Sequence, residues 1–245
     1  LAADAVVAWR TGASLVLDRR ADLALMLVAS VVVWWGFELA NVQLMASWSY
    51  TPSADVSMTA QRLRSSVAFA SLLPAMWQVG LLTAALWPRR DAATTEATPI
   101  RRSIAVAIAA GGAVLLGLGV ALPVVSLPLG LLGVFLLADA TNALRGRPSL
   151  LARALHGDVH FAVRLGLGNI AAGFVGEAWN YPADPKWTYD VPYADFLHVF
   201  EMPLPGYLGY GALALALFAI YHAVRPRFRV RTLPPEHPLV ESGLG

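Results

Sequence analysis

Six long apolar segments, separated by short polar stretches, dominate the chain. They cover residues 22–41, 65–87, 103–122, 123–141, 161–179 and 205–223. Each is close to the roughly 20 residues that cross the hydrocarbon core of a membrane as an α-helix. The pattern therefore predicts an all-α, polytopic membrane bundle of six spans, in which residues 1–245 form a single transmembrane domain.

The third and fourth segments follow one another almost without interruption. Only the prolines of "LPVVSLP", Leu122 to Pro128, mark the border between them. Because proline cannot continue a helix through its own position, we expect a tight helical hairpin that turns at Pro123.

The composition agrees with a membrane protein. Hydrophobic residues make up 57% of the chain and charged residues only 14%, far from the balance of a soluble domain. The chain contains no cysteine, which excludes a disulfide framework and any thiolate nucleophile or metal ligand.

The arginines are distributed unequally between the loops. Four segments carry most of them: Arg10, Arg19 and Arg20; Arg89, Arg90, Arg101 and Arg102; Arg145, Arg147 and Arg153; and Arg225, Arg227, Arg229 and Arg231. With six spans all four lie on one side, which the positive-inside rule assigns to the cytoplasm, and we expect the inner membrane of a bacterium. This distribution explains the basic balance of the chain without a nucleic-acid partner.

Two segments of the chain carry the same residues at the same separations. "GFELANVQLMASWSY" and "GEAWNYPADPKWTY" match at Glu38 and Glu177, Asn41 and Asn180, Trp48 and Trp187, and Tyr50 and Tyr189, each pair 139 residues apart. "DAVVAWRTGASL", from Asp4, and "DATNALRGRPSL", from Asp139, match at an offset of 135 residues. We expect a parallel internal repeat of three-helix units. Repeat one covers about 1–87, a spacer 88–122, repeat two 123–226 and a basic tail 227–245.

The first repeat is shorter than the second at its beginning. Only three residues precede Asp4, whereas a complete span precedes Asp139. Either a first transmembrane helix is missing from this chain, or the first copy is abbreviated; we favour the first alternative, which predicts seven spans in the parent protein.

The repeated acids are the first candidates for chemistry. Glu38 and Asn41 share one face of a helix, as do Glu177 and Asn180, and an ionisable residue in a span by default faces the bundle interior. Burial and a neighbouring acid both favour the neutral form of a carboxyl group, so such a pair can hold and donate a proton. Glu201, in "FEMPLPGYLGYG", adds a third acid in the second repeat alone.

A structural role accounts for the same residues. Trp and Tyr are common at membrane interfaces, which suits the pairs Trp48 with Tyr50 and Trp187 with Tyr189. A Glu or Asn at a helix end can hold the following loop through backbone hydrogen bonds. Both interpretations stay open at this point.

No cofactor or metal is expected. His160, His198 and His222 form no evident facing pair, so haem ligation has little support.

The layout resembles that of the integral-membrane isoprenoid cyclases, namely the lycopene cyclase domains of carotenoid pathways and the seven-helix cyclases of fungal meroterpenoid pathways. The resemblance rests on the parallel duplication and on the acids and WxY elements at one membrane face, and it covers most of the chain. It implies that acids from both halves protonate an epoxide or polyene, a role that falls by position on Glu38 and Glu177. The paired acids that follow proline in lycopene cyclases are absent, and "FEMP" with Glu201 is their nearest counterpart.

Two functions from different classes follow. The first is cyclisation of a lipophilic substrate by carboxylic-acid protonation, with aromatic faces stabilising the cation. The second is a non-catalytic subunit that binds a pigment, quinone or lipid, or scaffolds a membrane complex. Either way the expected partners are membrane lipid and an apolar small molecule. The candidate binding residues are Asn41, Asn180, Trp34, Trp35, Trp48, Tyr50, Trp179, Tyr181, Trp187 and Tyr189.

Overall fold

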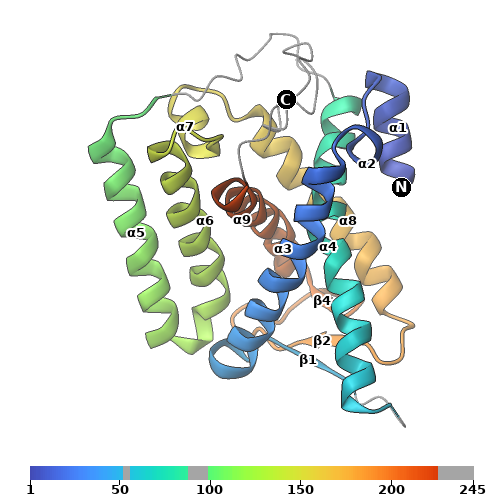
Figure 1. The fold of residues 1–245 in the computed structure, drawn as a ribbon. Helices are drawn as coiled ribbons and strands as arrows, with labels where there is room; N and C mark the ends of the chain where they lie inside the picture. Colours follow the sequence, from blue (N-terminus) through green and yellow to red (C-terminus); the bar gives the residue numbers. More distant parts are fainter. Residues whose placement is uncertain (52–55, 88–98, 226–245) are drawn as a thin grey trace.

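A computed structural model describes residues 1–51, 56–87 and 99–225 as a bundle of long helices with two small β-ribbons at one end (Figure 1). The predicted basic tail 227–245 and the arginines Arg89 and Arg90 lie outside the described residues. The elements are α1 (Ala2–Thr11), α2 (Leu15–Asp18), α3 (Arg20–Ala40), a π-helical turn (Asn41–Met45), β1 (Trp48–Tyr50), α4 (Met58–Leu86), α5 (Arg102–Ala121), a 3-10 turn (Pro123–Val125), α6 (Ser126–Leu144), α7 (Leu150–Leu155), α8 (His160–Asn180), β2 (Trp187–Tyr189), β3 (His198–Val199), β4 (Met202–Pro203), a 3-10 turn (Leu204–Tyr207) and α9 (Leu208–Val224).

Five helical segments of the described chain are long and apolar enough to cross a membrane. They are Arg20–Met45, Met58–Leu86, Arg102–Ala121, Pro123–Leu144 and Leu204–Val224. This is consistent with an integral membrane protein, and the predicted all-α class is confirmed.

The sixth predicted span, 161–179, is not confirmed. It forms the helix α8, which is 21 residues long, but α8 is not among the five segments that are apolar enough. The polar side chains Arg164, Asn169 and Glu177 lower its mean hydropathy. The described chain therefore has five candidate spans by length and composition, and the sixth span stays a prediction.

The predicted hairpin at Pro123 is confirmed. The 3-10 turn Pro123–Val125 joins α5 to α6, and the two helices pack closely along their length. At the crossing a Cβ atom on Gly112 would lie 2.8 Å from the carbonyl oxygen of Gly133, so only glycine permits this approach.

The hydrophobic core lies where α3, α4, α8 and α9 meet. Trp77 of α4 stacks on Phe218 of α9 with ring centroids 5.2 Å apart, and Phe161 of α8 adds a tilted contact to the same ring. These buried side chains hold the four helices together, and α5 with α6 packs on α9 from one side (Figure 1).

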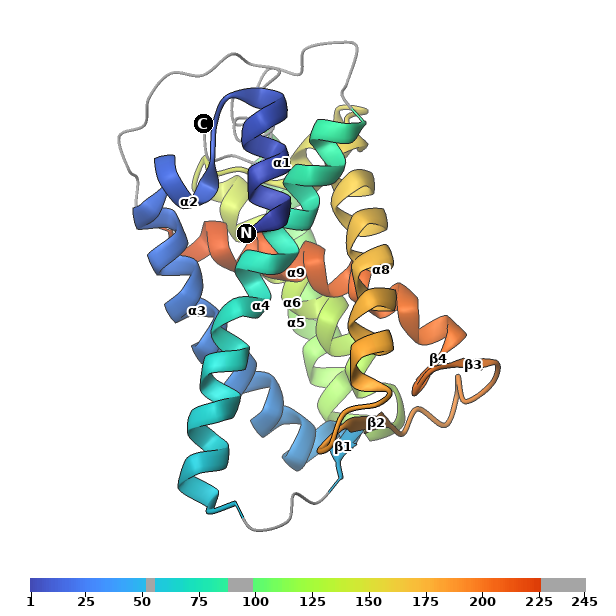
Figure 2. The same cartoon turned by 90° about the vertical axis from the view of Figure 1, so that its right-hand side faces the viewer.

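The two ends of the bundle differ in character. The starts of α3 and α5, the region around α7 and the end of α9 bear arginines and lie at one end, whereas the start of α4, with Arg62 and Arg64, lies at the other (Figure 1). At the first of these ends, the arginine end, Arg147 Nη1 donates to the carbonyl oxygens of His222, Ala223 and Arg225 at 2.5, 3.0 and 2.8 Å and caps α9. The strands lie at the opposite end, and α3 and α8 both run from the arginine end toward it (Figure 2).

Candidate functional site

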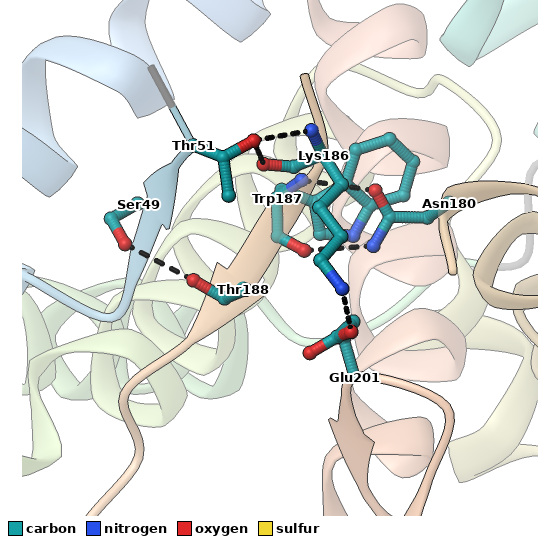
Figure 3. Close-up of polar contacts among 7 residues, drawn as sticks. All are labelled: Ser49, Thr51, Asn180, Lys186, Trp187, Thr188 and Glu201. Carbon is teal, nitrogen blue, oxygen red and sulfur yellow. Dashed lines mark hydrogen bonds and ion pairs between the residues drawn. The ribbon is translucent and has the colours of Figure 1, made fainter. Parts of the chain in front are cut away.

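The strands β1 and β2 join the two halves of the chain in an antiparallel ribbon. The paired residues are Trp48 with Tyr189, Ser49 with Thr188 and Tyr50 with Trp187. Main-chain bonds extend the pairing at both ends: Thr51 N donates to Lys186 O at 2.9 Å, and Asp190 N donates to Ser47 O at 2.8 Å. The ribbon is therefore symmetric about Ser49 and Thr188, whose hydroxyl oxygens lie 3.2 Å apart and which are 139 residues apart in sequence (Figure 3).

The two repeated asparagines hold the strands in place. Asn180 Nδ2 donates to Trp187 O at 2.8 Å, and Trp187 N donates to Asn180 Oδ1 at 2.9 Å (Figure 3). Asn41 makes the same two bonds with the main chain of Trp48, at 2.7 and 3.2 Å. Both asparagines, which the sequence offered as candidate binding residues, therefore hold the main chain of the two tryptophans.

The aromatic side chains of the ribbon bind the two glutamates. Glu38 Oε1 accepts hydrogen bonds from Trp48 Nε1 at 3.3 Å and Tyr50 OH at 2.5 Å. Glu177 Oε1 accepts from Trp187 Nε1 at 3.2 Å and Tyr189 OH at 2.7 Å.

The strand geometry places these groups in one layer. Residues two apart on a strand, and residues directly opposite on its partner, share one face of a ribbon. The four aromatic side chains therefore lie on the same face, and the structure brings Glu38 and Glu177 beneath it. We call Glu38, Trp48 and Tyr50 the first clasp.

The second clasp consists of Glu177, Trp187, Tyr189 and an additional residue, Tyr210 of α9. Tyr210 OH donates to Glu177 Oε1 at 2.5 Å and lies 3.3 Å from Tyr189 OH. Its ring rests against α8 at Gly173, where a Cβ atom would overlap it. The sequence had indicated neither Tyr210 nor Gly173; the only signal was that "GYLGYG" occurs in the second repeat alone.

Burial separates the two clasps most clearly. Glu38 is partly exposed and Tyr50 is 43% exposed, whereas Glu177 is 0% exposed. The second oxygen of Glu177, Oε2, is also a buried acceptor without a hydrogen-bond partner among the described residues.

The phenols of Tyr50 and Tyr189 remain donors at neutral pH. Burial raises the pKa of Tyr50, and the hydrogen bond to Glu38 raises it further. Burial also raises the pKa of Tyr189, with added contributions from Tyr210 and Glu177. Both hydroxyl groups therefore keep the proton that they donate to a carboxylate.

Several predicted residues lie away from the glutamates. Glu201 accepts from Lys186 Nζ at 2.5 Å and ties the β3–β4 hairpin to the start of β2 (Figure 3). Trp179 is 77% exposed on the outside of α8, and Tyr181 is 55% exposed.

The two remaining candidates belong to α3. Trp35 Nε1 donates to Ser66 Oγ of α4 at 3.0 Å. Trp34 packs against Phe37 and Phe69, with ring centroids 6.0 and 5.8 Å away. Both tryptophans thus help to hold α3 against α4, through Ser66 and Phe69.

A second set of matched contacts lies at the arginine end. Asp4 accepts from Ser14 Oγ at 2.5 Å and from Leu15 N at 2.8 Å. Asp139 accepts from Ser149 Oγ at 2.6 Å and from Leu150 N at 3.0 Å. In both places an aspartate of one helix fixes the N-terminus of the next, so the other matched sequence block also makes matched contacts.

Within residues 1–51, 56–87 and 99–225, no group of three His, Asp or Glu side chains could hold a metal ion. Comparison with known proteins gives no match: no family model, curated protein or solved structure matches the chain. The geometry of the two clasps is therefore the basis of the functional conclusion.

Proposed function

We propose that this chain is a membrane-embedded enzyme that protonates a lipophilic, isoprenoid-like substrate and thereby starts its cyclisation, with Glu177 as the general acid. The observation that carries the proposal is the state of Glu177: one carboxyl oxygen accepts three hydrogen bonds, and the other is buried without a partner among the described residues. An unsatisfied buried polar group costs about 1–3 kcal/mol, and each such group in a folded protein calls for an explanation. A proton delivered from Oε2 to a bound substrate supplies one.

The hydrogen bonds that Glu177 accepts within the described chain come from the uncharged donors Trp187, Tyr189 and Tyr210. The proposal requires that Oε2 carry the proton when the substrate is bound. Once the proton leaves, the same three donors stabilise the carboxylate that forms, which lowers the barrier to transfer.

The reaction balances without an oxidant or reductant. The Oε2–H bond breaks, and the proton adds to a double bond, which leaves a carbocation, or to an epoxide oxygen, whose C–O bond then opens to a hydroxyl group and a carbocation. A neighbouring double bond then closes the ring onto the cation. Loss of a proton from carbon back to the carboxylate restores Glu177 and gives an isomer of the substrate. The rings of Trp187, Tyr189 and Tyr210 surround the acid and can stabilise the cation while it exists.

Internal duplication of a parallel three-helix unit explains why two clasps are present. It is supported by the matched bonds of Asn41 and Asn180, by those of Asp4 and Asp139, and by the common direction of α3 and α8. In this proposal the first copy closes the ribbon end of the bundle and the second carries the chemistry. The arginine end faces the cytoplasm, as the positive-inside rule requires.

One observation favours a second candidate, a non-catalytic subunit for a pigment, quinone or lipid. The first clasp is satisfied by its own Trp48 and Tyr50, and both asparagines bind the main chain of the strands. These residues are therefore fully used in holding the fold. In that case Glu177 Oε2 would donate a hydrogen bond to a bound ligand without transferring the proton.

The variant Glu177→Gln separates the two candidates, because it keeps the size of the side chain and removes the transferable proton. Product formation should fall by roughly 10²–10⁴-fold. Glu38→Gln is the matched control and should retain product. The measurement is untargeted mass spectrometry of apolar extracts from an isoprenoid-producing host that expresses each variant. If Glu177→Gln gives the same new products as the wild type, Glu177 is not the acid. If the wild type only retains an unchanged host molecule, the second candidate holds.

A further inference from the structure

The segment between β2 and α9 is far longer than its counterpart between β1 and α4. Residues 190–207 separate β2 from α9, whereas only residues 51–57 separate β1 from α4. The longer segment contains the β3–β4 hairpin, in which His198 pairs with Pro203 and Val199 with Met202. Figure 2 shows this hairpin extending sideways from the bundle at its ribbon end.

The hairpin is held firmly against the helices. Tyr207 OH donates to Val199 O at 2.8 Å, and Leu204 N donates to Leu197 O at 3.1 Å. The ion pair of Lys186 with Glu201 ties its turn to the start of β2. Its outward side chains are therefore displayed in a fixed arrangement.

Several of those outward side chains are large and apolar or aromatic. Phe196 is 54%, Leu197 69% and Phe200 37% exposed, and Tyr193 is 45% exposed. Leu197 and Phe200 also adopt left-handed backbone conformations, with φ of 53° and 59°, which bulky side chains rarely take. The fold thus maintains strained backbone in a segment that presents large apolar groups, a combination typical of functional surfaces.

We propose that the β3–β4 hairpin lies in the membrane interface at the ribbon end of the bundle, with Phe196 and Leu197 inserted among the lipids. The lipid surface is favoured because the patch is continuous with the lipid-facing sides of the neighbouring helices. Trp179 and Tyr181 are exposed at the end of α8, and Leu204 and Leu208 at the start of α9. Aromatic side chains at such helix ends mark the headgroup level of a bilayer. The ion pair of Asp195 with His198 supplies polar groups for the headgroup side.

The absence of cysteine makes a direct test possible. Single cysteines at Phe196 and Leu197 would carry a spin label in the protein reconstituted into phosphatidylcholine bilayers, and collision with oxygen and with a water-soluble nickel chelate would be measured. Two positions calibrate the scale: Val175, 53% exposed on α8 within the bundle, and Ala183, exposed in the turn between α8 and β2. Thermal unfolding of each labelled protein confirms that it is folded.

Labels at Phe196 and Leu197 should be reached mainly by oxygen, with a depth between those of the labels at Val175 and Ala183. Nickel access equal to that at Ala183 would place the hairpin in water and overturn the proposal. Low access to both reagents with an immobilised spectrum would also overturn it, because protein, such as a second copy of the chain, would then cover the patch. The proposal does not depend on any catalytic role of Glu177.

Discussion

The two clasps use the same residue types in the same register, yet they present their carboxylates to different surroundings. In the first, Glu38 is partly exposed and accepts hydrogen bonds from Trp48 and Tyr50. In the second, Glu177 is fully buried and has Tyr210 as an additional donor. The repeated side chains therefore make the same hydrogen bonds in both clasps, whereas the exposure of the two glutamates differs. Tyr210 of α9 adds its contact to Glu177 alone. Only the second carboxyl group is suited to chemistry that needs a dry site.

The largest difference between the clasps should appear when the carboxylates are removed. Glu177→Ala leaves three half-buried donors without their acceptor, at about 1 kcal/mol each, so it should destabilise the protein by about 3 kcal/mol. Glu38→Ala should cost about 1 kcal/mol, because water can reach the donors that lose Glu38. Thermal unfolding in detergent, followed by circular dichroism, measures both. Equal losses of stability would remove the distinction between the clasps.

A smaller and symmetric effect is expected at the asparagines. Asn41→Asp and Asn180→Asp each keep the acceptor and lose the donor to a strand carbonyl, so each should cost about 1–2 kcal/mol. The two values should agree, because both side chains are buried and lose the same donor bond, whereas the extra bond that Asn41 Oδ1 accepts from Ser47 N is kept in Asn41→Asp. The same unfolding assay applies. A difference larger than about 1 kcal/mol, the scale of a single hydrogen bond, would show that the two asparagines do not stabilise their strands equally.

The smallest effect is expected at Tyr210, the residue that only the second clasp has. Tyr210→Phe removes the third donor to Glu177 and keeps the ring beside Gly173, so it should cost about 1 kcal/mol. Combined with Glu177→Ala it should cost less than the sum of the two single changes, because both act on one hydrogen bond. Tyr50→Phe is the matched control in the first clasp and should cost about half as much, because its hydroxyl group is partly hydrated. Additive losses for Tyr210 and Glu177 would mean that Tyr210 does not act through the carboxylate.

Much of the fold was predictable from periodic features of the sequence. The helix positions followed from apolar length, and the hairpin at Pro123 from two prolines. The sixth predicted span does form a 21-residue helix, but its apolar character does not confirm a span, because Arg164, Asn169 and Glu177 lower its mean hydropathy. The helix α4 begins at Met58 rather than near residue 65, because Ser57 caps it with a side-chain bond to Ala60 N. A cap of this kind fixes where a helix begins, and a hydropathy pattern does not detect it.

The candidate site was predictable only in part. Identical spacing of Glu, Asn, Trp and Tyr indicated that Glu38 and Glu177 belong together, and the β1–β2 ribbon does place them under one face. The pairing of the two WxY elements as strands was not predicted, because each covers only three residues. Tyr210 was missed because its contact with Glu177 joins α9 to α8 across 33 residues without a repeated motif. Contacts that depend on helix packing have no short-range signature in the sequence.

The central claim is that Glu177 is the acid, which requires a transferable proton on its carboxyl group, and infrared spectroscopy tests this most directly. A buried, protonated carboxyl group gives a carbonyl stretching band that is distinct from the bands of carboxylates. The wild type and Glu38→Gln should both show this band at neutral pH, and Glu177→Gln should lose it. A wild-type spectrum without the band, or a band that survives in Glu177→Gln and disappears in Glu38→Gln, would contradict the assignment of Glu177 as the acid.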